Sequence, residues 1–398
     1  MKEDRYTGEY QKTNGSCPEN IAMLGSLPPL RALSSYCLEL ALAVADLGKV
    51  EFISFKKIYP ARLYPGGDLK DDHTFPIIGH PNLKVRRRLT WYNPVSWIIE
   101  GISTNTVLLH AQWWSLPLAI VYFVVCLGFK LRRKPVIFTV HNILQHDKSL
   151  LYRIISRMLF KLGDHFIVHS LSNRAQLIKY YKIPLNRITQ IPHGPLAFYV
   201  QDNMDRNAVR NKMGFDPENS VVLLFGTIRP YKGIDTALKA FAQVLPKIPG
   251  ARLLIAGKLW EKWDDYEQLI DDLRIEDYIK TYLRYIPCGE VFKFFAASDL
   301  VILPYHHFDS QSGVGSTAVF FRKPMIVTNV GGLPELVADR RYVVPPEDSE
   351  ALADKIVCCL KDPARLAQMS AEADKVANAI AWPAIAQKTW SVYDNVLS

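Results

Sequence analysis

Short apolar runs rich in β-branched residues alternate with longer amphipathic runs along the whole chain, and this alternation constrains the fold more than any other feature. It is typical of a parallel β-sheet whose strands are joined by crossover helices. A helix is predicted over residues 32–46, because apolar residues recur there at spacings of three and four and Gly48 follows. In the first half the predicted strands are Val50–Phe55, Thr106–His110, Pro135–Val140, Asp164–His169 and Arg187–Ile191.

The same alternation starts again in the second half of the chain. The predicted strands there are Val221–Phe225, Ala251–Ala256, Leu300–Pro304 and Pro324–Thr328. A chain of 398 residues is about twice the size that one core usually fills. We therefore expect two α/β domains, residues 1–198 and 199–380, connected through the polar stretch 201–220. In open α/β sheets ligands bind beyond the carboxyl ends of the strands, so a site is expected where the two sheets face each other.

The end of the chain is predicted to form two helices. Residues 362–380 have a helical pattern, and Trp382-Pro383 interrupts it before a last amphipathic segment, residues 381–398. This last helix belongs either to the core of the second domain or to a contact with the first.

Positive charge is confined to one half of the chain. The first 200 residues hold 25 Lys and Arg against 13 Asp and Glu, whereas the remainder holds 23 against 26. The imbalance favours an anionic partner, such as lipid head groups, nucleic acid or a phosphorylated substrate; the alternative is a basic surface without a specific partner. No aromatic residues are interleaved with Lys and Arg in a recognisable nucleic-acid module, so a nucleic-acid partner is not expected.

One apolar segment tests whether the chain contacts a membrane. Residues 116–129 are uncharged and largely apolar, and four cations follow within residues 130–134. The segment is too short to span a bilayer, which takes about 20 residues. It is either a buried core helix or a helix that docks on the cytoplasmic face of a membrane, helped by the basic cluster Arg86–Arg88.

The cysteines and the N-terminus indicate a cytoplasmic protein. The six cysteines form no C-x-x-C pair and no zinc-binding spacing, so reduced thiols are expected. The first 16 residues are polar and include acids, unlike a secretory signal or a transit peptide.

Two polar loops after predicted strands are candidates for the site. In GTIRPYKG (Gly226–Gly233), Arg229 and Lys232 lie between a strand and a helix, where two cations can clamp a diphosphate; surface charges are the alternative. In DSQSGVGST (Asp309–Thr317), the glycines allow backbone N–H groups to approach an anion at a helix N-terminus.

These loops also carry a family resemblance. GTIRPYKG, LLIAGK (Leu253–Lys258) and PMIVTNVGGLPELV (Pro324–Val337), in this order, resemble the retaining GT-B glycosyltransferases grouped as family 4, most strongly over residues 221–337. The resemblance implies two Rossmann-like domains facing across a cleft, with the acceptor on the N-terminal side and the nucleotide sugar on the C-terminal side. It also implies that residues 381–398 return to the N-terminal domain.

The resemblance further implies roles for individual residues. Arg229 and Lys232 would hold the donor diphosphate, and His141 would contact the donor sugar, unless it is only a strand-end histidine. The implied catalytic residues are His141, Asp309, Arg229 and Lys232. The implied donor-binding residues are Gly25, Ser26, Gly226, Gln311, Ser312, Gly313, Val314, Gly315, Ser316 and Thr317.

One family motif is altered. The family usually has two glutamates separated by seven residues, and counting back from Pro324 places Asp309 and Thr317 at these positions. QSGV (Gln311–Val314) replaces the usual E-G-F-G turn, a variant seen in members that otherwise look intact. A hydroxyl of Ser316 or Thr317 is then expected to bond the ribose. Stereochemistry follows from the resemblance and not from these residues.

We therefore expect a glycosyltransferase, a hexosyltransferase of the EC 2.4 class, that acts on a glycan or lipid-linked acceptor in polysaccharide biosynthesis. It is expected to be cytoplasmic and peripheral on a membrane through residues 116–134 and 86–88. The sequence has no Asp-x-Asp motif, so no metal and no cofactor are expected. Alternatives are a soluble sugar or sugar phosphate as acceptor, a catalytically silent GT-B protein that binds anionic lipid, and a sugar-nucleotide epimerase.

Overall fold

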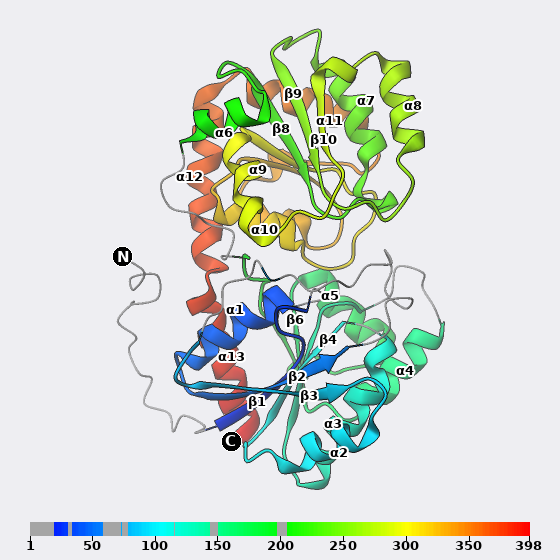
Figure 1. Ribbon diagram of the computed structural model, residues 1–398, viewed down its shortest axis with the longest axis vertical. Helices are drawn as coiled ribbons and strands as arrows, with labels where there is room; N and C mark the ends of the chain where they lie inside the picture. The colour runs from blue at the N-terminus through cyan, green and yellow to red at the C-terminus, as the bar shows by residue number, and fades with distance from the viewer. Residues whose placement is uncertain are drawn as a thin grey trace.

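Two parallel β-sheets, each covered by helices on both faces, make up the protein (Figure 1). The computed structural model describes residues 20–30, 34–58, 73, 79–114, 116–143, 150–196 and 205–398. The expected pair of parallel α/β sheets is thereby confirmed. The predicted boundary at residues 198 and 199, and the beginning of the predicted connector, lie outside the described residues.

The first sheet has seven strands in the order β3-β2-β1-β4-β5-β6-β7. They are β1 (Asn20–Leu24), β2 (Lys49–Lys57), β3 (Leu83–Thr90), β4 (Leu109–Trp113), β5 (Val136–Val140), β6 (His165–Val168) and β7 (Ile188–Gln190). Its described helices are α1 (Ser34–Ala45), α2 (Pro94–Ser103), α3 (Ala119–Leu131), α4 (Leu150–Phe160) and α5 (Leu171–Gln176). We call this half the N-terminal domain.

The second sheet has six strands in the order β10-β9-β8-β11-β12-β13. They are β8 (Ser220–Phe225), β9 (Ala251–Ala256), β10 (Ile279–Tyr282), β11 (Leu300–Leu303), β12 (Met325–Thr328) and β13 (Val343–Val344). Its helices are α6 (Arg206–Met213), α7 (Ile234–Val244), α8 (Asp264–Leu273), α9 (Val291–Ala297), α10 (Gly313–Phe320), α11 (Ser349–Leu360) and α12 (Pro363–Ala379). We call this half the C-terminal domain.

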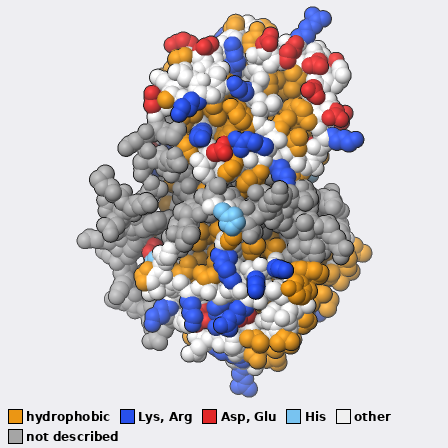
Figure 2. All heavy atoms as spheres, in the orientation of Figure 1, with side chains coloured by type: hydrophobic (Ala, Val, Ile, Leu, Met, Phe, Trp, Pro, Cys, Tyr) orange, Lys and Arg blue, Asp and Glu red, His pale blue; other side chains and the backbone are white. Residues whose placement is uncertain are grey.

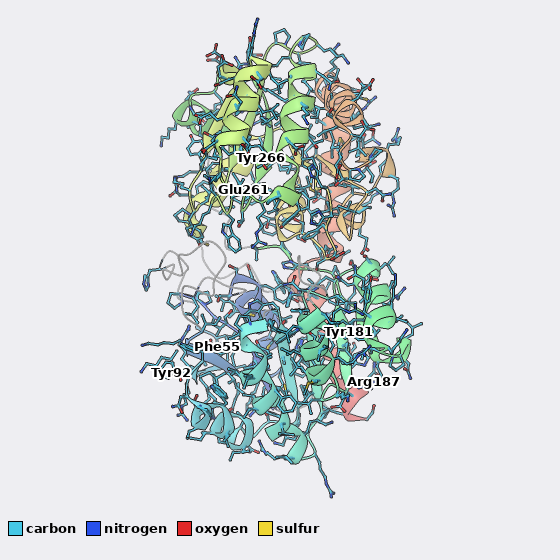
Figure 3. The ribbon with its side chains drawn as sticks, turned by 90° about the vertical axis from the view of Figure 1, so that its right-hand side faces the viewer. Phe55, Tyr92, Tyr181, Arg187, Glu261 and Tyr266 are labelled. Atoms are coloured by element: carbon cyan, nitrogen blue, oxygen red, sulfur yellow. The ribbon has the colours of Figure 1, made fainter. Side chains whose placement is uncertain are left out.

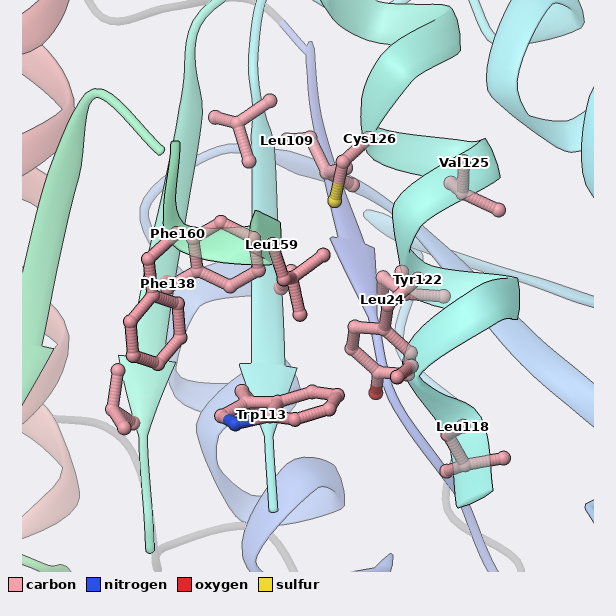
Figure 4. Packing of buried hydrophobic residues seen from close by; sticks show 14 of the residues in the cluster. Leu24, Leu109, Trp113, Leu118, Tyr122, Val125, Cys126, Phe138, Leu159 and Phe160 are labelled. Atoms are coloured by element: carbon pink, nitrogen blue, oxygen red, sulfur yellow. The ribbon is translucent and has the colours of Figure 1, made fainter. Parts of the chain in front are cut away.

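Alternate residues of each strand divide between two cores, because successive side chains of a strand point to opposite faces of the sheet. In the N-terminal domain, Ala22 and Leu24 face a core with α3 and α4, whereas Ile21 and Met23 face α1. Figure 4 shows the first of these cores, in which Trp113 and Phe138 of the sheet lie opposite Tyr122 and Leu159 of the helices. The two faces of this sheet are therefore covered independently.

The last helix, α13 (Trp382–Leu397), packs on the N-terminal domain. It contacts α1, and its Trp382, Trp390 and Tyr393 belong to the same core as the α1 face of the sheet. The indole nitrogen of Trp382 donates to the Pro195 carbonyl at 2.7 Å. Of the two placements left open by the sequence, the structure has the one that ties the end of the chain to the first domain.

Four strands, β1, β3, β10 and β13, have no counterpart among the predicted strand ranges, and one predicted strand was displaced. β10 and β13 are short strands at or near the edge, and β3 contains the Arg86–Arg88 cluster, which hides an edge strand in a run of charge. The strand predicted at 106–110 begins at Leu109 and ends at Trp113. Two polar residues of this strand, His110 and Gln112, are wholly buried, so the polarity of the sequence there misled the prediction.

The basic cluster Arg86–Arg88 is exposed at Arg87 and Arg88 but not at Arg86. Arg86 is turned inward and pairs with the buried Glu100 at 2.7 Å, and Arg87 donates to the carbonyls of Leu27 and Pro28. Arg88, with a side chain 66% exposed, lies with Nη1 3.8 Å from Oε1 of the same Glu100. Arg86 and Arg88, two residues apart on β3, therefore both reach Glu100, whereas Arg87 is directed elsewhere.

Candidate functional site

Both sheets reverse their strand order at one point, between β1 and β4 and between β8 and β11. Loops that follow adjacent strands diverge at such a point and leave room for a ligand beyond the carboxyl ends of the strands. Gly25 and Ser26 follow β1, and Gly226 follows β8. These predicted site residues therefore lie where the strand order of each sheet reverses. Each domain thereby contributes a loop to the site.

The loop after β8 is held close to its neighbours by glycines. Gly226 has φ +108°, and a Cβ there would lie 2.9 Å from a methyl group of Val314 and 3.6 Å from Lys232 Nζ. Gly233 has φ +69°, and its Cβ would lie 1.9 Å from the Pro304 carbonyl oxygen. Because a side chain at either position would meet atoms of the neighbouring loop, GTIRPYKG requires glycine at both ends. The predicted loop is thus joined to residues 304–314.

Lys232 is a buried cation with no carboxylate paired to it among the described residues. Its Nζ donates to the hydroxyl of Tyr305 and lies 4.1 Å from the centre of the same ring. The Tyr305 hydroxyl lies 3.2 Å from Ser312 Oγ. Burial, and then the positive charge of Arg229, lowers the pKa of Lys232 to about 7. A buried ammonium of this kind is stabilised by an anionic ligand.

Arg229 lies three residues before Lys232 and stacks on an aromatic ring. Its guanidinium carbon is 3.8 Å from the centre of the Trp260 ring, a cation–π contact. The structure therefore brings the two predicted cations together, one buried and one half-buried. Tyr305 and Trp260 were missed by the sequence analysis, since an aromatic residue after a strand carries no distinctive signal.

The N-terminus of α10 lies beside these cations. Ser312 caps it, with Oγ accepting from Gly315 N at 3.3 Å. Thr317 Oγ1 donates back to the Gly313 carbonyl at 2.8 Å, whereas the fully buried Ser316 Oγ has no hydrogen-bond partner. Of the two hydroxyls predicted to reach a ribose, Ser316 is thus the one without an internal bond. A buried donor with no partner is costly unless a ligand or water satisfies it.

Asp309 and Gln311 connect the two domains. Asp309 is exposed, and its Oδ1 accepts from Gln176 Nε2 of α5 at 3.0 Å. Gln311 is buried, and its Oε1 accepts from the His193 backbone N–H at 2.5 Å. The altered acidic motif therefore contributes interdomain hydrogen bonds in this structure.

Glu335, in the run NVGGLPE, makes a second interdomain contact that was not predicted. Its two oxygens accept from Leu171 N at 3.0 Å and Gln190 Nε2 at 2.8 Å. Burial raises the pKa of Glu335, and these two hydrogen bonds oppose the rise. The signal in the sequence was the acid in a Gly-rich loop, which was noted only as part of the family motif.

His141 is buried, with 6% of its surface exposed, and both ring nitrogens have partners. Nε2 lies 3.0 Å from the Gln112 side-chain amide, and Nδ1 lies 3.0 Å from His169 Nε2. The ring of Tyr36 meets it edge-on, with ring centres 4.7 Å apart. A contact between a donor sugar and a ring nitrogen of His141 would replace one of these bonds, and the predicted role stays a prediction.

Gly25 and Ser26 lie deep in the N-terminal domain. A Cβ on Gly25 would meet Cys37 Sγ at 2.9 Å and Gln112 at 3.4 Å, so Gly25 neighbours the histidine network rather than the cations of the C-terminal domain. Ser26 Oγ is buried without a partner. Within the described residues, no group of three His, Cys, Asp or Glu is arranged to hold a metal ion.

Two family models match the chain in succession. Residues 205–376 match the model described as "Glycosyl transferases group 1", and residues 33–194 match the model described as "Glycosyltransferase Family 4". The two matches correspond to the C-terminal and the N-terminal sheet.

Curated relatives share a name that specifies an acceptor. The D-inositol 3-phosphate glycosyltransferase of Segniliparus rotundus is 28% identical over 236 residues, covering 58% of this chain and 52% of the relative. The protein of the same name from Corynebacterium aurimucosum is 26% identical over 256 residues, covering 62% of this chain and 60% of the relative. The chain thus matches only about half of the length of the curated relatives.

Solved structures share the whole fold. Sucrose-phosphate synthase from Thermosynechococcus elongatus has a TM-score of 0.72 at 20% identity, covering 95% of this chain and 98% of that one. HepE from Anabaena, in complex with UDP, has a TM-score of 0.71 at 18% identity, covering 95% and 100%. At this identity the likeness shows the fold alone.

Proposed function

The chain belongs to the group 1 glycosyltransferases of the GT-B fold, and from this premise we propose that it transfers a hexose from a nucleotide-diphosphate sugar to a glycan or lipid-linked acceptor. The observation that carries the proposal is the buried Lys232 beside Arg229. Lys232 has no carboxylate paired to it in the described part of the chain. Two cations placed at the carboxyl end of β8 suit the diphosphate of a donor.

Arg229 and Lys232 act on the leaving group. As the bond between the anomeric carbon and the diphosphate oxygen breaks, negative charge develops on that oxygen, and preorganised cations in a water-poor site stabilise it. The N-terminus of α10 adds its backbone N–H groups and its dipole. These groups provide the stabilisation without a metal ion and without a cofactor.

Transfer proceeds with retention of configuration. The acceptor hydroxyl forms its bond to the anomeric carbon on the face that the diphosphate leaves, and its proton passes to the departing phosphate oxygen. Atoms and charge balance without a protein nucleophile. His141 and Asp309 then position the donor sugar, and Ser316 bonds the ribose or the sugar through its buried hydroxyl. The neighbouring Gly226 and Gly313 let the donor approach the backbone.

The acceptor is anionic or attached to an anionic carrier. The basic N-terminal half supports this, with 25 Lys and Arg against 13 acids in residues 1–200. The name shared by the curated relatives favours a second candidate, a soluble sugar phosphate as acceptor. The five described cysteines are free thiols, which suits a cytoplasmic enzyme, and within the described residues no helix is both long and apolar enough to cross a bilayer.

A donor screen tests the proposal. UDP-glucose and a panel of other sugar nucleotides are incubated with the full chain and either inositol phosphate or a lipid-linked sugar, and NMR of the anomeric proton of the product reports donor, acceptor and stereochemistry. Arg229→Ala should lower turnover by at least about a hundredfold. Lys239→Ala, a surface cation on α7 with 52% of its side chain exposed, is the matched control. Absence of turnover with every donor, with Arg229→Ala binding UDP like the parent, would refute the proposal.

A further inference from the structure

Helix α2 is apolar on both of its faces. Trp97 and Gly101 face inward, and Gly101 meets Gly128 of α3 so closely that a Cβ on Gly128 would lie 2.8 Å from its backbone. Val95, Ile98, Ile99 and Ile102 face outward and are between 43% and 61% exposed. The one charged residue of the helix, Glu100, is buried and paired with Arg86. A helix that is apolar all round is normally covered on every side.

The outward faces of the next two helices continue this surface. α2 packs on α3, and α3 packs on α4, all over the same core of the N-terminal domain. On α3, Ile120 and Leu131 are 68% and 75% exposed, and on α4, Leu151 and Met158 are 58% and 55% exposed. We call the outward faces of α2, α3 and α4 the apolar surface. Figure 2 shows hydrophobic side chains gathered over the lower right of the molecule, where Figure 1 places these helices.

Aromatic residues extend the apolar surface at the start of α2. Trp91 is 37% exposed and Tyr92 is 56% exposed. Figure 3 shows Tyr92 at the outer edge of the N-terminal domain. Trp and Tyr are the residues enriched where an apolar phase meets water, because their rings are apolar and their N–H or O–H is polar.

Cations surround the apolar surface and acids are scarce there. Residues 81–163, which contain β3, α2, α3 and α4, hold 12 Lys and Arg against two acids, Glu100 and Asp147. Arg88 on β3, Arg133 after α3, and Arg157 and Lys161 at the end of α4 are all exposed. Most of the positive excess of the N-terminal half therefore belongs to the segment that carries the apolar surface.

We propose that the apolar surface docks flat on an anionic lipid bilayer. Apolar side chains on three neighbouring helices enter the interface, and the surrounding cations meet anionic head groups. A second copy of the chain is the less suitable occupant, because two such surfaces would bring their like-charged rims together. Docking differs from the prediction made from the sequence, in which residues 116–134 alone formed the docking helix. Most apolar residues of α3 lie in the core, so the outward residues of α2 and α4 make up most of the surface that enters the lipid, with Ile120 and Leu131 of α3.

Vesicle flotation with the full chain tests the proposal. The parent should float with vesicles of phosphatidylcholine mixed with phosphatidylglycerol, and much less with phosphatidylcholine alone or at high salt. Ile98→Glu combined with Ile102→Glu should lower the bound fraction more than about tenfold, since two exposed apolar side chains are replaced by anions. Leu397→Glu is the matched control, because Leu397 is an exposed apolar residue, 39% accessible, on α13 over the opposite face of the sheet.

A second double variant tests the proposal if the first one is too unstable to measure. Arg133→Gln with Lys161→Gln changes only exposed cations, and removing each charge should weaken binding by about fivefold, the factor that corresponds to about 1 kcal/mol per charge near the surface. Light scattering of the protein without vesicles tests the alternative occupant of the surface, a second copy of the chain. A parent dimer that Ile98→Glu with Ile102→Glu converts to a monomer, with no flotation of either, assigns the surface to a second copy and overturns the proposal. Flotation of all variants like the parent also overturns it.

Discussion

His169 Nε2 lies 3.0 Å from His141 Nδ1, and both rings are buried. His169 Nδ1 faces the Ile191 carbonyl oxygen at 3.0 Å, and a carbonyl only accepts, so this nitrogen carries the proton. A neutral His169 therefore accepts at Nε2, and His141 donates from Nδ1. The Ile191 carbonyl therefore determines which nitrogen of His169 carries the proton, and through His169 it determines the tautomer of His141.

The same reasoning extends the network to the last helix. His141 Nε2 must then accept. The structure places Gln112 Oε1 next to this nitrogen and Gln112 Nε2 3.1 Å from His110 Nε2, so the chain of donation requires the Gln112 amide to be turned by 180°, with its NH₂ group towards His141 and its oxygen towards His110. His110 then donates from Nε2, which also lies 2.7 Å from Thr139 Oγ1, and accepts at Nδ1 from the hydroxyl of Tyr393, at 2.7 Å. If every hydrogen bond is donated in the same direction, from the Tyr393 hydroxyl towards the Ile191 carbonyl, each neutral ring has one nitrogen that donates and one that accepts.

Tyr393→Phe is the first test of this network. It leaves His110 Nδ1 as a buried acceptor without a donor, which costs about 1–3 kcal/mol in the free energy of unfolding. Urea denaturation measures the loss, and Tyr92→Phe, at a 56% exposed position, should leave stability unchanged. ¹⁵N NMR of the histidine rings adds a second readout, since removal of the Tyr393 proton should allow His110 to change tautomer. Equal stability of the two variants would contradict the assigned chain of donation.

Acid should destabilise the protein through four buried histidines. Burial lowers the pKa of His110 and of His169 to about 3 and of His193 to about 4, and it lowers that of His141 as well. Because the unfolded rings titrate near 6.5, the unfolded state binds more protons below that pH. The neutral rings thus contribute stability that is complete above pH 6.5 and is lost as pH falls towards 4, by up to about 1.4 kcal/mol per pH unit for each ring. Urea unfolding at successive pH values measures the slope.

A variant isolates one of the four rings. His193→Asn should show a smaller loss of stability between pH 7 and pH 5 than the parent, whatever its stability at neutral pH. The parent slope is the reference. A flat profile for the parent over this window would show that these rings stay neutral in both states or charge in both.

The alternation of strands and helices predicted the fold because each sheet is parallel and buried on both faces, so strands stand out as short apolar runs. Ala251–Ala256 was predicted at its exact bounds. The network around His141 was beyond sequence reasoning, since His110, Gln112 and Tyr393 come from β4 and α13, which are 283 residues apart at the His110–Tyr393 bond. Buried polar side chains satisfy one another across the fold, and no local pattern records which pairs meet.

The same division applies to the candidate site: its local patterns were predictable from the sequence, and its contacts between distant segments were not. Arg229 and Lys232 follow a strand in a Gly-bounded loop, and such local patterns are visible in one chain. The partners Trp260 and Tyr305 lie on other loops and were missed. Asp309 was predicted from the family motif, but its hydrogen bond to Gln176 joins two domains and depends on how they meet.

Gly233→Ala should disrupt the loop that carries the cations. The Cβ would lie 1.9 Å from the Pro304 carbonyl oxygen, at a φ of +69° that L residues adopt at a cost of about 1–2 kcal/mol. We expect at least that loss in the free energy of unfolding, together with weaker UDP binding because Lys232 is adjacent. Gly250→Ala is the control, since its nearest neighbour would be 3.9 Å away. Similar stabilities for the two alanine variants in urea would contradict the close approach of the two loops.

Lys232 should make donor binding depend on pH. Its pKa of about 7 follows from burial without a carboxylate partner, and a bound diphosphate raises that pKa by supplying opposite charge. Binding above pH 7 therefore takes up a proton, and affinity for UDP should fall by up to about tenfold per pH unit from pH 7 upward. Calorimetry in two buffers of different ionisation enthalpy counts the proton. Lys232→Arg, which stays charged, should flatten the profile, whereas Lys239→Arg on the surface of α7 should keep it. If the parent binds UDP with the same heat in both buffers at pH 8, Lys232 is already charged in the free protein and does not control donor binding.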